Sequence, residues 1–575
     1  MEDAITYIDS SSISRKVISI AAGEAHTLAL TGDGSVFSWG RGTFGRLGTG
    51  LELDRLFPTK TEFKSGDRSE KVNIVGVSAG SYHSLALSDD GSVWSWGHNT
   101  YGQLGVNGDY SLVPSLIKGF QGISPTDGSI TKNETRLKIS SVKAGGMMSL
   151  AIDHLGSLWI WGNCPPQDSP NEGEEFALLT TYTPMPVWFF HGQTVVKVAC
   201  GNEHIVALVS SGDIDKVGDL VCYSWGNNNH GQLGLGDTEI QAAPKMINTF
   251  STESSWAAYE LACGAFHTCI LAYEKGDGDA LKSVCWTFGL GDNGQLGLGT
   301  INKALHPEIV ESLPVNVWLV SVDCGLFHTS VVSSVGDVWS WGMENGLGLC
   351  TEASEGGDAL TPRLISCNGP NGSNGSNESN FPDTIQVACG AAHTVLLADN
   401  GYKLWSWGRG RSGVLGNDQV NDCFDPNLVL WPPLDQDFEK NEPDMINVKN
   451  NDKIYAEKSS KDITEAEKIN VKNSNKTYAE KSSKDFIEVE KKLNVLERYA
   501  TVLHGSVFGT PFDKENDIPA SLKESGSFDV GKELEDMFES CDYGTLVQLE
   551  TFYRNMLASV KDKIMKKKIK EMNKE

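Results

Sequence analysis

The segment Gly80-Ser81-Tyr82-His83, followed closely by Val93-Trp94-Ser95-Trp96-Gly97, decides the fold of this chain. An apolar run at 84–87 and the turn sequence Asp89-Asp90-Gly91-Ser92 lie between the two segments. Two apolar runs joined by such a turn are typical of a β-hairpin. Because alternate residues of a strand point to opposite faces, we expect Trp94 and Trp96 to share one buried face.

The same pattern recurs seven times. Each copy opens with a glycine, two variable residues and, in six copies, a histidine; the openings are Gly23-Glu24-Ala25-His26, Gly80-Ser81-Tyr82-His83, Gly145-Gly146-Met147-Met148, Gly201-Asn202-Glu203-His204, Gly264-Ala265-Phe266-His267, Gly325-Leu326-Phe327-His328 and Gly390-Ala391-Ala392-His393. Each copy closes with an aromatic residue and glycine, at Trp39-Gly40, Trp96-Gly97, Trp161-Gly162, Trp225-Gly226, Phe288-Gly289, Trp341-Gly342 and Trp407-Gly408. Such self-similarity predicts one structural unit per copy.

After the aromatic pair, most units have a glycine-rich loop such as Gly102-Gln103-Leu104-Gly105, and then a proline such as Pro114. We expect the proline to start an outer strand, since an edge strand needs no ladder donor there. The unit is then a four-stranded sheet, which cannot bury both faces alone, whereas seven sheets arranged radially can. The sequence therefore predicts an all-β, seven-bladed β-propeller with repeats starting near residues 17, 74, 139, 195, 258, 319 and 384. Its ends near Val17 and Leu434 should meet.

Composition limits the classes of function. The 575 residues carry a formal net charge of -27, of which 1–440 hold -24 and 441–575 hold -3. This charge argues against a protein that coats nucleic acid phosphates, and no direct nucleic acid binding is expected from the propeller. No apolar stretch is long enough for a membrane-spanning helix, and no signal peptide is visible. Twelve Cys in such a chain indicate reduced thiols in the nucleus or cytoplasm.

The seven correlated copies, together with their Gly-x-x-His openings and Trp-Gly closings, resemble the regulator of chromosome condensation repeat family, whose members are seven-bladed propellers. The resemblance covers residues 17–434 and includes the plant ultraviolet-B-receptor-like branch. In that branch a Gly-Trp-Arg-His-Thr motif recurs in the later blades, and its Trp absorbs ultraviolet light. The segments 201–205, 264–268 and 325–329 lack both the Trp and the Arg, so photoreception is not expected here.

The repeated histidines and cysteines are interpreted as structural. One histidine per unit, at His26, His83, His204, His267, His328 and His393, favours a buried hydrogen bond inside each blade over a converging metal site. Cys200, Cys263, Cys324 and Cys389 occupy the place of Ala22, Ala79 and Ala144, which indicates small apolar filling. The run 289–294 matches a dinucleotide fingerprint but lacks a following strand–helix unit. No cofactor, metal or catalytic residue is therefore assigned.

The third unit departs most from the pattern, with Met148 for histidine and no Gly-Gln-Leu-Gly loop. Its segment after Trp161-Gly162 carries the acidic residues Asp168, Glu172, Glu174 and Glu175, a candidate interaction loop. The alternative is an exposed, solvated loop without a partner. The founding family's activity, guanine-nucleotide exchange on a small GTPase, uses a wedge from the third blade; no such wedge can be aligned to this loop.

The remaining chain divides into a charged linker at 441–492 and a small helical region at 493–575. The linker is a tandem duplication of 446–468 in 469–491 and is expected to be disordered or marginally helical. An apolar stripe at helical spacing follows Val530. The lysines Lys566, Lys567, Lys568 and Lys570 are a candidate nuclear import patch, or they only complement the helix dipole.

These observations favour a non-catalytic propeller scaffold that mediates protein–protein interaction, with a regulatory role in chromatin or signalling. Its acidic excess suits partners with basic surfaces such as histones. The alternative is a guanine-nucleotide exchange factor for a small GTPase, and an ultraviolet-B photoreceptor is the third hypothesis. Nucleus and cytoplasm are the expected locations.

Overall fold

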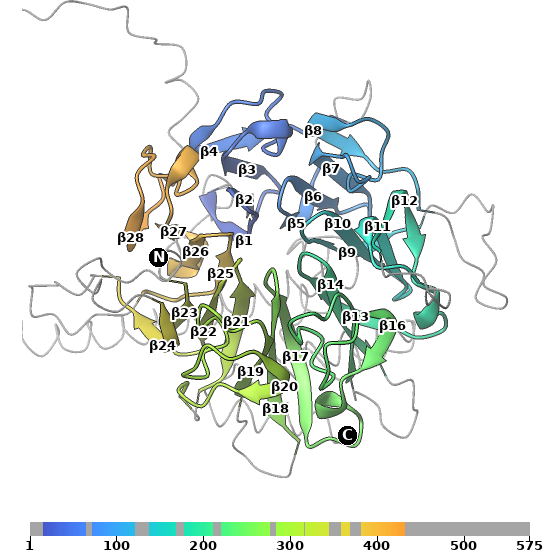
Figure 1. Cartoon of the computed structure of the whole chain (residues 1–575). Helices are drawn as coiled ribbons and strands as arrows, with labels where there is room; N and C mark the ends of the chain where they lie inside the picture. Colours follow the sequence, from blue (N-terminus) through green and yellow to red (C-terminus); the bar gives the residue numbers. More distant parts are fainter. Residues whose placement is uncertain are drawn as a thin grey trace, which may run out of the picture. The chain divides into compact units, whose positions relative to one another are not determined.

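The computed structural model describes residues 15–64, 72–120, 137–167, 177–210, 220–275, 283–314, 317–343, 358–367 and 381–431. These residues form seven four-stranded antiparallel sheets, each built from consecutive strands and numbered in chain order from blade 1 (β1 to β4) to blade 7 (β25 to β28). The sheets follow one another around a ring, as Figure 1 shows. The predicted seven-bladed, all-β propeller is therefore confirmed.

The strands are grouped here by their place in the blade. The innermost strands are β1 (Val17–Ala22), β5 (Ile74–Ala79), β9 (Ile139–Ala144), β13 (Val195–Cys200), β17 (Trp256–Cys263), β21 (Leu319–Cys324) and β25 (Gln386–Cys389). The second strands are β2 (His26–Thr31), β6 (His83–Ser88), β10 (Met148–Asp153), β14 (His204–Ser210), β18 (His267–Glu274), β22 (His328–Ser333) and β26 (His393–Ala398).

The third strands are β3 (Val36–Gly40), β7 (Val93–His98), β11 (Leu158–Cys164), β15 (Leu220–Gly226), β19 (Ser283–Gly289), β23 (Val338–Gly342) and β27 (Lys403–Gly408). The outer strands are β4 (Arg55–Thr61), β8 (Tyr110–Leu116), β12 (Leu179–Pro186), β16 (Gln241–Met246), β20 (Ala304–Ile309), β24 (Ala359–Ile365) and β28 (Cys423–Leu428). Short 3-10 turns are η1 (Thr43–Gly45), η2 (Trp188–Phe190), η4 (Asn248–Phe250), η7 (Asp399–Gly401) and η8 (Arg411–Gly413).

The hydrophobic core lies between the blades. Each of the seven apolar clusters draws side chains from two neighbouring sheets. Second strands such as β6 are buried along their whole length, because both of their faces meet a neighbour. Trp94 and Trp96 are both buried, as predicted from their alternation. No blade can therefore keep its core without the next one.

The ring closes between blade 7 and blade 1. The Gln386 side chain accepts from the Ile20 amide and donates to the Ile20 carbonyl, both at 3.0 Å. The Trp431 indole Nε1 donates to the Arg15 carbonyl oxygen at 2.9 Å. These contacts confirm that the two ends of the repeat array meet.

The prediction that a proline starts each outer strand is wrong. Pro58 is the fourth residue of β4 and Pro114 the fifth residue of β8. In both strands the pairing register is shifted around the proline. The shift lies between the residue that pairs with the closing glycine of the third strand and the residue that directly follows the proline. A bulge on an edge strand accommodates a residue that cannot donate, which explains proline inside the strand.

The helical tail, the duplicated linker and the lysine patch lie outside the described residues, so their predictions stand untested. The same holds for the boundaries at 441–492 and 493–575. Among the residues that the structure describes, no helix has the length and apolar character needed to cross a membrane.

Candidate functional site

The repeated histidines join neighbouring blades. His26 Nε2 bonds Ser84 Oγ of blade 2 at 2.9 Å, and His83 Nε2 bonds Ser149 Oγ of blade 3 at 2.8 Å. The same bond links the pairs His204–Thr268, His267–Thr329, His328–Thr394 and His393–Thr27. The predicted buried hydrogen bond is therefore confirmed, but its expected place inside each blade is wrong: the bond spans each junction, because the faces of neighbouring sheets meet there.

The serine or threonine hydroxyl that each histidine contacts determines which nitrogen of the imidazole carries hydrogen. Thr329 Oγ1 donates to the Gln295 carbonyl oxygen at 2.9 Å, and Trp341 Nε1 donates to the same oxygen at 2.8 Å. Since the hydroxyl has only one proton to give, it accepts from His267 Nε2, which therefore carries hydrogen. The glycine-rich loop of one blade thus binds the histidine, hydroxyl and indole system of the junction through one backbone carbonyl.

Burial keeps these histidines neutral. It lowers the pKa of His83, His204 and His328 to about 3 and that of His393 to about 4. A buried imidazole whose Nε2 already donates is poorly placed to act as an acid or base near neutral pH. The histidine–hydroxyl bonds therefore stabilise the packing between neighbouring blades and do not provide acid–base chemistry.

The junction between blades 3 and 4 replaces this pair. Met148 stands where the other blades have histidine, and it is fully buried. At the other junctions the following blade supplies a serine or threonine hydroxyl. Blade 4 has Ile205 at this position, and Ile205 belongs to the same apolar cluster as Met148. The two changes are matched, because an isoleucine facing a histidine would leave a buried N–H without an acceptor.

The cysteines before the opening glycines are buried or half-buried free thiols. Burial raises the pKa of Cys200 to about 12 and also raises the pKa of Cys263, Cys324 and Cys389. Protonated thiols of this kind behave as small apolar side chains and are poor nucleophiles.

One group of buried side chains has the donor set of a metal site. A ring nitrogen of His267 and the sulfur atoms of Cys269 and Cys324 lie within 4.8 Å of one another. However, His267 Nε2 already bonds Thr329, as at junctions without thiols, and burial disfavours the Cys324 thiolate that zinc requires. The repeat pattern accounts for His267 and Cys324 but not for Cys269, which stands where the other blades have Leu28, Leu85, Leu150, Val206, Ser330 and Val395.

At one end of the blades, the turns that follow the innermost strands lie beside the loops that follow the third strands. A cluster of aromatic and basic side chains lies at this end, between blades 1 and 2. There Phe44, Arg46, Tyr82 and His98 form what we name the blade 1–2 cluster. The Arg46 guanidinium lies 4.5 Å from the centre of the Tyr82 ring, and the Phe44 ring lies 4.6 Å from that of His98. Arg46 also donates to the carbonyls of Thr43 and Ser81, both at 3.1 Å.

The cluster is held in a fixed conformation. Phe44 has a φ of 62° in η1, a left-handed conformation that few non-glycine residues adopt, and its side chain is 36% exposed. Burial lowers the pKa of Arg46 to about 10, which leaves the guanidinium charged at neutral pH. The result is a buried cation beneath the exposed Phe44 ring and the half-buried rings of Tyr82 and His98.

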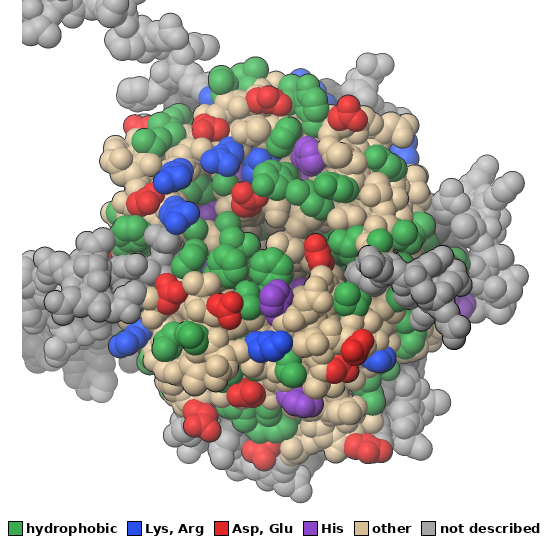
Figure 2. Space-filling view, viewed as in Figure 1, with side chains coloured by type: hydrophobic (Ala, Val, Ile, Leu, Met, Phe, Trp, Pro, Cys, Tyr) green, Lys and Arg blue, Asp and Glu red, His purple; other side chains and the backbone are tan. Residues whose placement is uncertain are grey.

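The sequence-predicted acidic loop residues Asp168, Glu172, Glu174 and Glu175 lie outside the described residues. The blade 1–2 cluster was not predicted. Its one signal in the sequence is Arg46, which stands where three other loops have glutamine at Gln103, Gln232 and Gln295. The face seen in Figure 2 shows hydrophobic side chains near its middle and basic and acidic side chains interspersed around them.

The positions that carry the photoreceptor motif are well defined. They hold Asn202-Glu203, Ala265-Phe266 and Leu326-Phe327. Phe266 and Phe327 stack with their ring centres 6.3 Å apart and an angle of 27° between the ring planes. No indole lies at these positions, in agreement with the sequence analysis.

A closed ring of repeated blades, joined at six of its seven junctions by histidine–hydroxyl bonds, defines a propeller made from a single type of repeat. The model of the RCC1-like domain matches residues 4–270, and models of the regulator of chromosome condensation (RCC1) repeat match 284–332, 335–397 and 385–414. The chain belongs to the regulator of chromosome condensation repeat family.

Several relatives carry different roles. The ultraviolet-B receptor UVR8 of Arabidopsis thaliana is 30% identical over 423 residues, covering 72% of this chain and 82% of its own. The human E3 ubiquitin-protein ligase HERC2 is 29% identical over 45% of this chain but only 5% of its own. The mitochondrial RCC1 domain-containing protein RUG3 of Arabidopsis thaliana is 28% identical, covering 56% of this chain and 65% of its own.

Solved structures support the fold. That of Prp20p from Saccharomyces cerevisiae, a protein studied for its binding to Gsp1p and histones, has a TM-score of 0.52 and 23% identity. It covers 73% of this chain and 88% of its own. Human WBSCR16 has a TM-score of 0.53 and 22% identity, covering 69% of this chain and 94% of its own.

Proposed function

We propose that this chain is a non-catalytic propeller scaffold that binds protein partners at the blade 1–2 cluster. The observation that carries the proposal is an exposed Phe44 packed in a ring cluster with Tyr82 and His98 above the buried cation Arg46. Aromatic residues and arginine dominate the energetic centres of protein interfaces.

The rigid setting supports this proposal. Tyr82 follows an opening glycine whose added Cβ would clash with the Gly145 carbonyl and the His83 ring, so the turn has little freedom. Partners that dock on such a surface lose little conformational entropy from the scaffold side. Basic partners such as histones are the preferred class, because residues 1–440 carry a charge of -24. Nucleus or cytoplasm is the proposed location.

The experiment compares partner recovery from a nuclear extract by the full chain, Phe44→Ala and Tyr402→Ala. Tyr402 is 42% exposed and follows η7, at the opposite end of the blades, which makes it a matched aromatic control. Phe44→Ala should lose the partners and Tyr402→Ala should keep them. Recovery should fall at higher salt, and equal recovery by both variants would contradict the proposal.

Guanine-nucleotide exchange on a small GTPase is the second candidate, because blade 3 departs from the other blades at Met148 and after Gly162. Nucleotide release from a panel of GTPases tests it; acceleration that disappears when 163–180 is altered would favour exchange over the scaffold. Photoreception predicts a dimer that dissociates under ultraviolet light, and size-exclusion chromatography before and after illumination tests that hypothesis.

A further inference from the structure

An exposed apolar surface lies at the outer rim of blades 1 and 2. The Gly50 amide of the blade 1 loop donates to the Leu112 carbonyl of β8 at 2.9 Å, which places Leu51 beside Val113. The Leu51 and Val113 side chains are 49% and 50% exposed. Two further residues of the same loop and strand are at least as exposed, and the four together are named the rim patch: Leu51, Leu53, Tyr110 and Val113.

The same backbone contact recurs at two other junctions with polar side chains around it. The Gly236 amide donates to the Leu305 carbonyl at 2.9 Å, and the Gly299 amide to the Leu360 carbonyl at 2.8 Å. The residues at the places of Leu51 and Val113 are Asp237 with His306 and Thr300 with Thr361. The contact between loop and outer strand therefore requires no apolar side chain. Single exposed apolar residues are ordinary, whereas a group of them indicates a binding surface.

Acidic side chains flank the rim patch. Glu52 stands between Leu51 and Leu53, and it is exposed. Asp109 directly precedes Tyr110 and is exposed as well. Neither carboxylate forms an ion pair with another residue in the part of the chain that the structure describes. An occupant that combines an apolar stripe with basic side chains would match both features of this surface.

The C-terminal segment, which lies outside the described residues, has both features in its sequence. Its apolar residues recur three or four apart, at Leu546, Leu549, Tyr553, Met556, Val560 and Ile564. This spacing is typical of one face of an amphipathic helix. Six lysines follow between 561 and 570.

The C-terminal segment also starts from the right place. The Trp431 ring packs on the Phe37 ring of blade 1, with the ring centres 5.1 Å apart, so the chain leaves the described structure beside the blade that carries Leu51. The 114 residues from 432 to 545 separate this point from the stripe. A connection of that length does not restrict which part of blades 1 and 2 the stripe can reach.

We propose that residues 546–570 bind the rim patch of the same chain as an amphipathic helix. The apolar stripe lies on Leu51 and Val113, and the lysines face Glu52 and Asp109. Because the segment and the patch belong to one chain, the local concentration of the segment is high, and a small apolar surface is enough to hold it. The rim patch shares no residue with the blade 1–2 cluster, so the two proposals fail independently.

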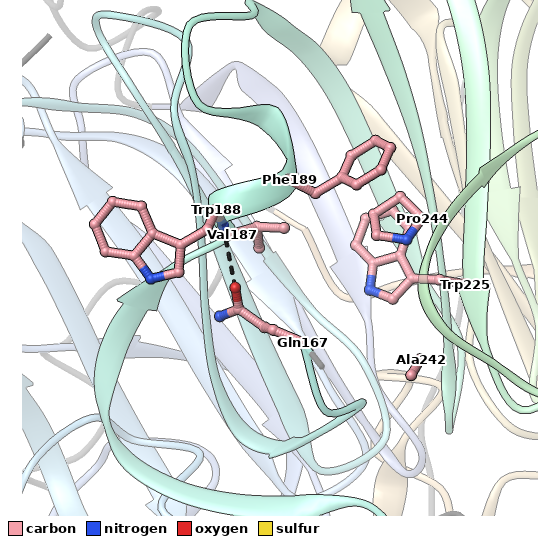
Figure 3. A pocket seen from close by; sticks show the side chains of 7 residues that line it. All are labelled: Gln167, Val187, Trp188, Phe189, Trp225, Ala242 and Pro244. Carbon is pink, nitrogen blue, oxygen red and sulfur yellow. Dashed lines mark hydrogen bonds between the residues drawn. The ribbon is translucent and has the colours of Figure 1, made fainter. Parts of the chain in front are cut away.

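A second exposed apolar surface provides a matched control. Trp188 and Phe189 are 43% and 46% exposed and project from η2 beside a pocket that Gln167, Trp225 and Pro244 also line (Figure 3). The sequence from 186 to 197 contains no acidic residue. This surface is therefore apolar without the flanking negative charge of the rim patch, and a helix attracted by apolar area alone would bind there equally well.

The test measures binding of a fluorescent peptide with the sequence of residues 543–571 to the full chain by fluorescence polarisation. The double variant Leu549→Glu/Met556→Glu breaks the chain's own stripe. It should bind the peptide at least about tenfold more tightly than the unaltered chain, whose own segment competes for the rim patch.

Further substitutions in this double variant locate the site. Leu51→Glu should weaken peptide binding by about tenfold or more, because a charge replaces an apolar contact. Glu52→Gln should weaken it by about two- to threefold, and only at low salt. Phe189→Glu should bind the peptide as the double variant does.

Several outcomes would overturn the proposal. Absence of peptide binding by the double variant, or equal losses in Leu51→Glu and Phe189→Glu, would contradict the rim patch as the site. Equal affinities of the unaltered chain and the double variant would show that the chain's own segment does not occupy it. A dimer in light scattering that Leu51→Glu dissociates would assign the rim patch to a second copy instead. Thermal melting shows that each variant is folded, and Val113→Glu repeats the test should Leu51→Glu melt early.

Discussion

The junctions between blades 5 and 6 and between blades 3 and 4 solve one packing problem with opposite chemistry. In the first, His267, Thr329 and Trp341 converge through hydrogen bonds on the Gln295 carbonyl. In the second, Met148 and Ile205 pack without hydrogen bonds. The comparison teaches that a junction either pairs a buried donor with an acceptor or is apolar at both positions, because a buried donor that has lost its acceptor costs more than either.

A fall in pH should give the largest loss of folding stability, because it acts on the junctions that contain buried histidines. An unfolded histidine binds a proton near pH 6.5, whereas His83, His204 and His328 stay neutral in the folded ring down to a pKa of about 3. The unfolded state binds more protons in this window, so stability is full above pH 6.5 and is lost as the pH falls toward 3. Each such histidine removes about 1.4 kcal/mol per pH unit there.

Urea unfolding at several pH values from about 7 to about 4 measures this loss. The double variant His267→Met/Thr329→Ile copies the apolar pair into the 5–6 junction and should show a shallower pH dependence. An unchanged slope in that variant would mean that other groups drive acid unfolding.

A mismatch in the apolar junction should give the next effect. Met148→His places a buried imidazole against Ile205 and should destabilise the ring by about 3 kcal/mol. Ile205→Thr alone should cost about 2 kcal/mol. The double variant should recover at least about 1 kcal/mol of their sum, as measured by a double-mutant cycle in urea. Strict additivity of the two changes would refute the idea that these positions are matched.

The two indoles offer a finer comparison. Trp341→Phe removes a hydrogen bond to the Gln295 carbonyl and should cost about 1 kcal/mol more than Trp225→Phe, whose N–H has no partner in the described structure. Both substitutions remove similar buried area, so the packing losses largely cancel. Equal midpoints of urea unfolding for the two variants would show that the loop carbonyl contributes nothing.

The smallest effect is expected at Cys324, where blade 3 has Ala144. Cys324→Ala should change stability by no more than about 1 kcal/mol, because the thiol is protonated and acts as filling. Elemental analysis of the purified chain gives the complementary measurement. About one zinc per chain that disappears in Cys324→Ala would instead assign a metal to His267, Cys269 and Cys324.

The repeated unit, the ring and its closure could be predicted from the sequence, since Trp94 and Trp96 alternate and the Gly-x-x-His openings recur. The hydrogen-bond partner of each repeated histidine could not be predicted, because periodicity identifies equivalent positions but not which neighbouring side chain each one faces. The bulge at Pro58 was missed for a related reason: an edge strand and a bulge tolerate proline equally well. The blade 1–2 cluster depends on Arg46 reaching Tyr82 of the next unit, which only the three-dimensional ring brings together.

The contact between Arg15 and Trp431, where the two ends of the ring meet, has a consequence for engineering. Every blade is made from one uninterrupted segment, and the two ends of the ring touch through the Trp431 indole and the Arg15 carbonyl. A short linker between these residues would close the backbone into a circle, and new termini could then be opened in any link between blades. A circular permutant that starts at Leu319 would keep all seven sheets, since no strand is shared across the seam.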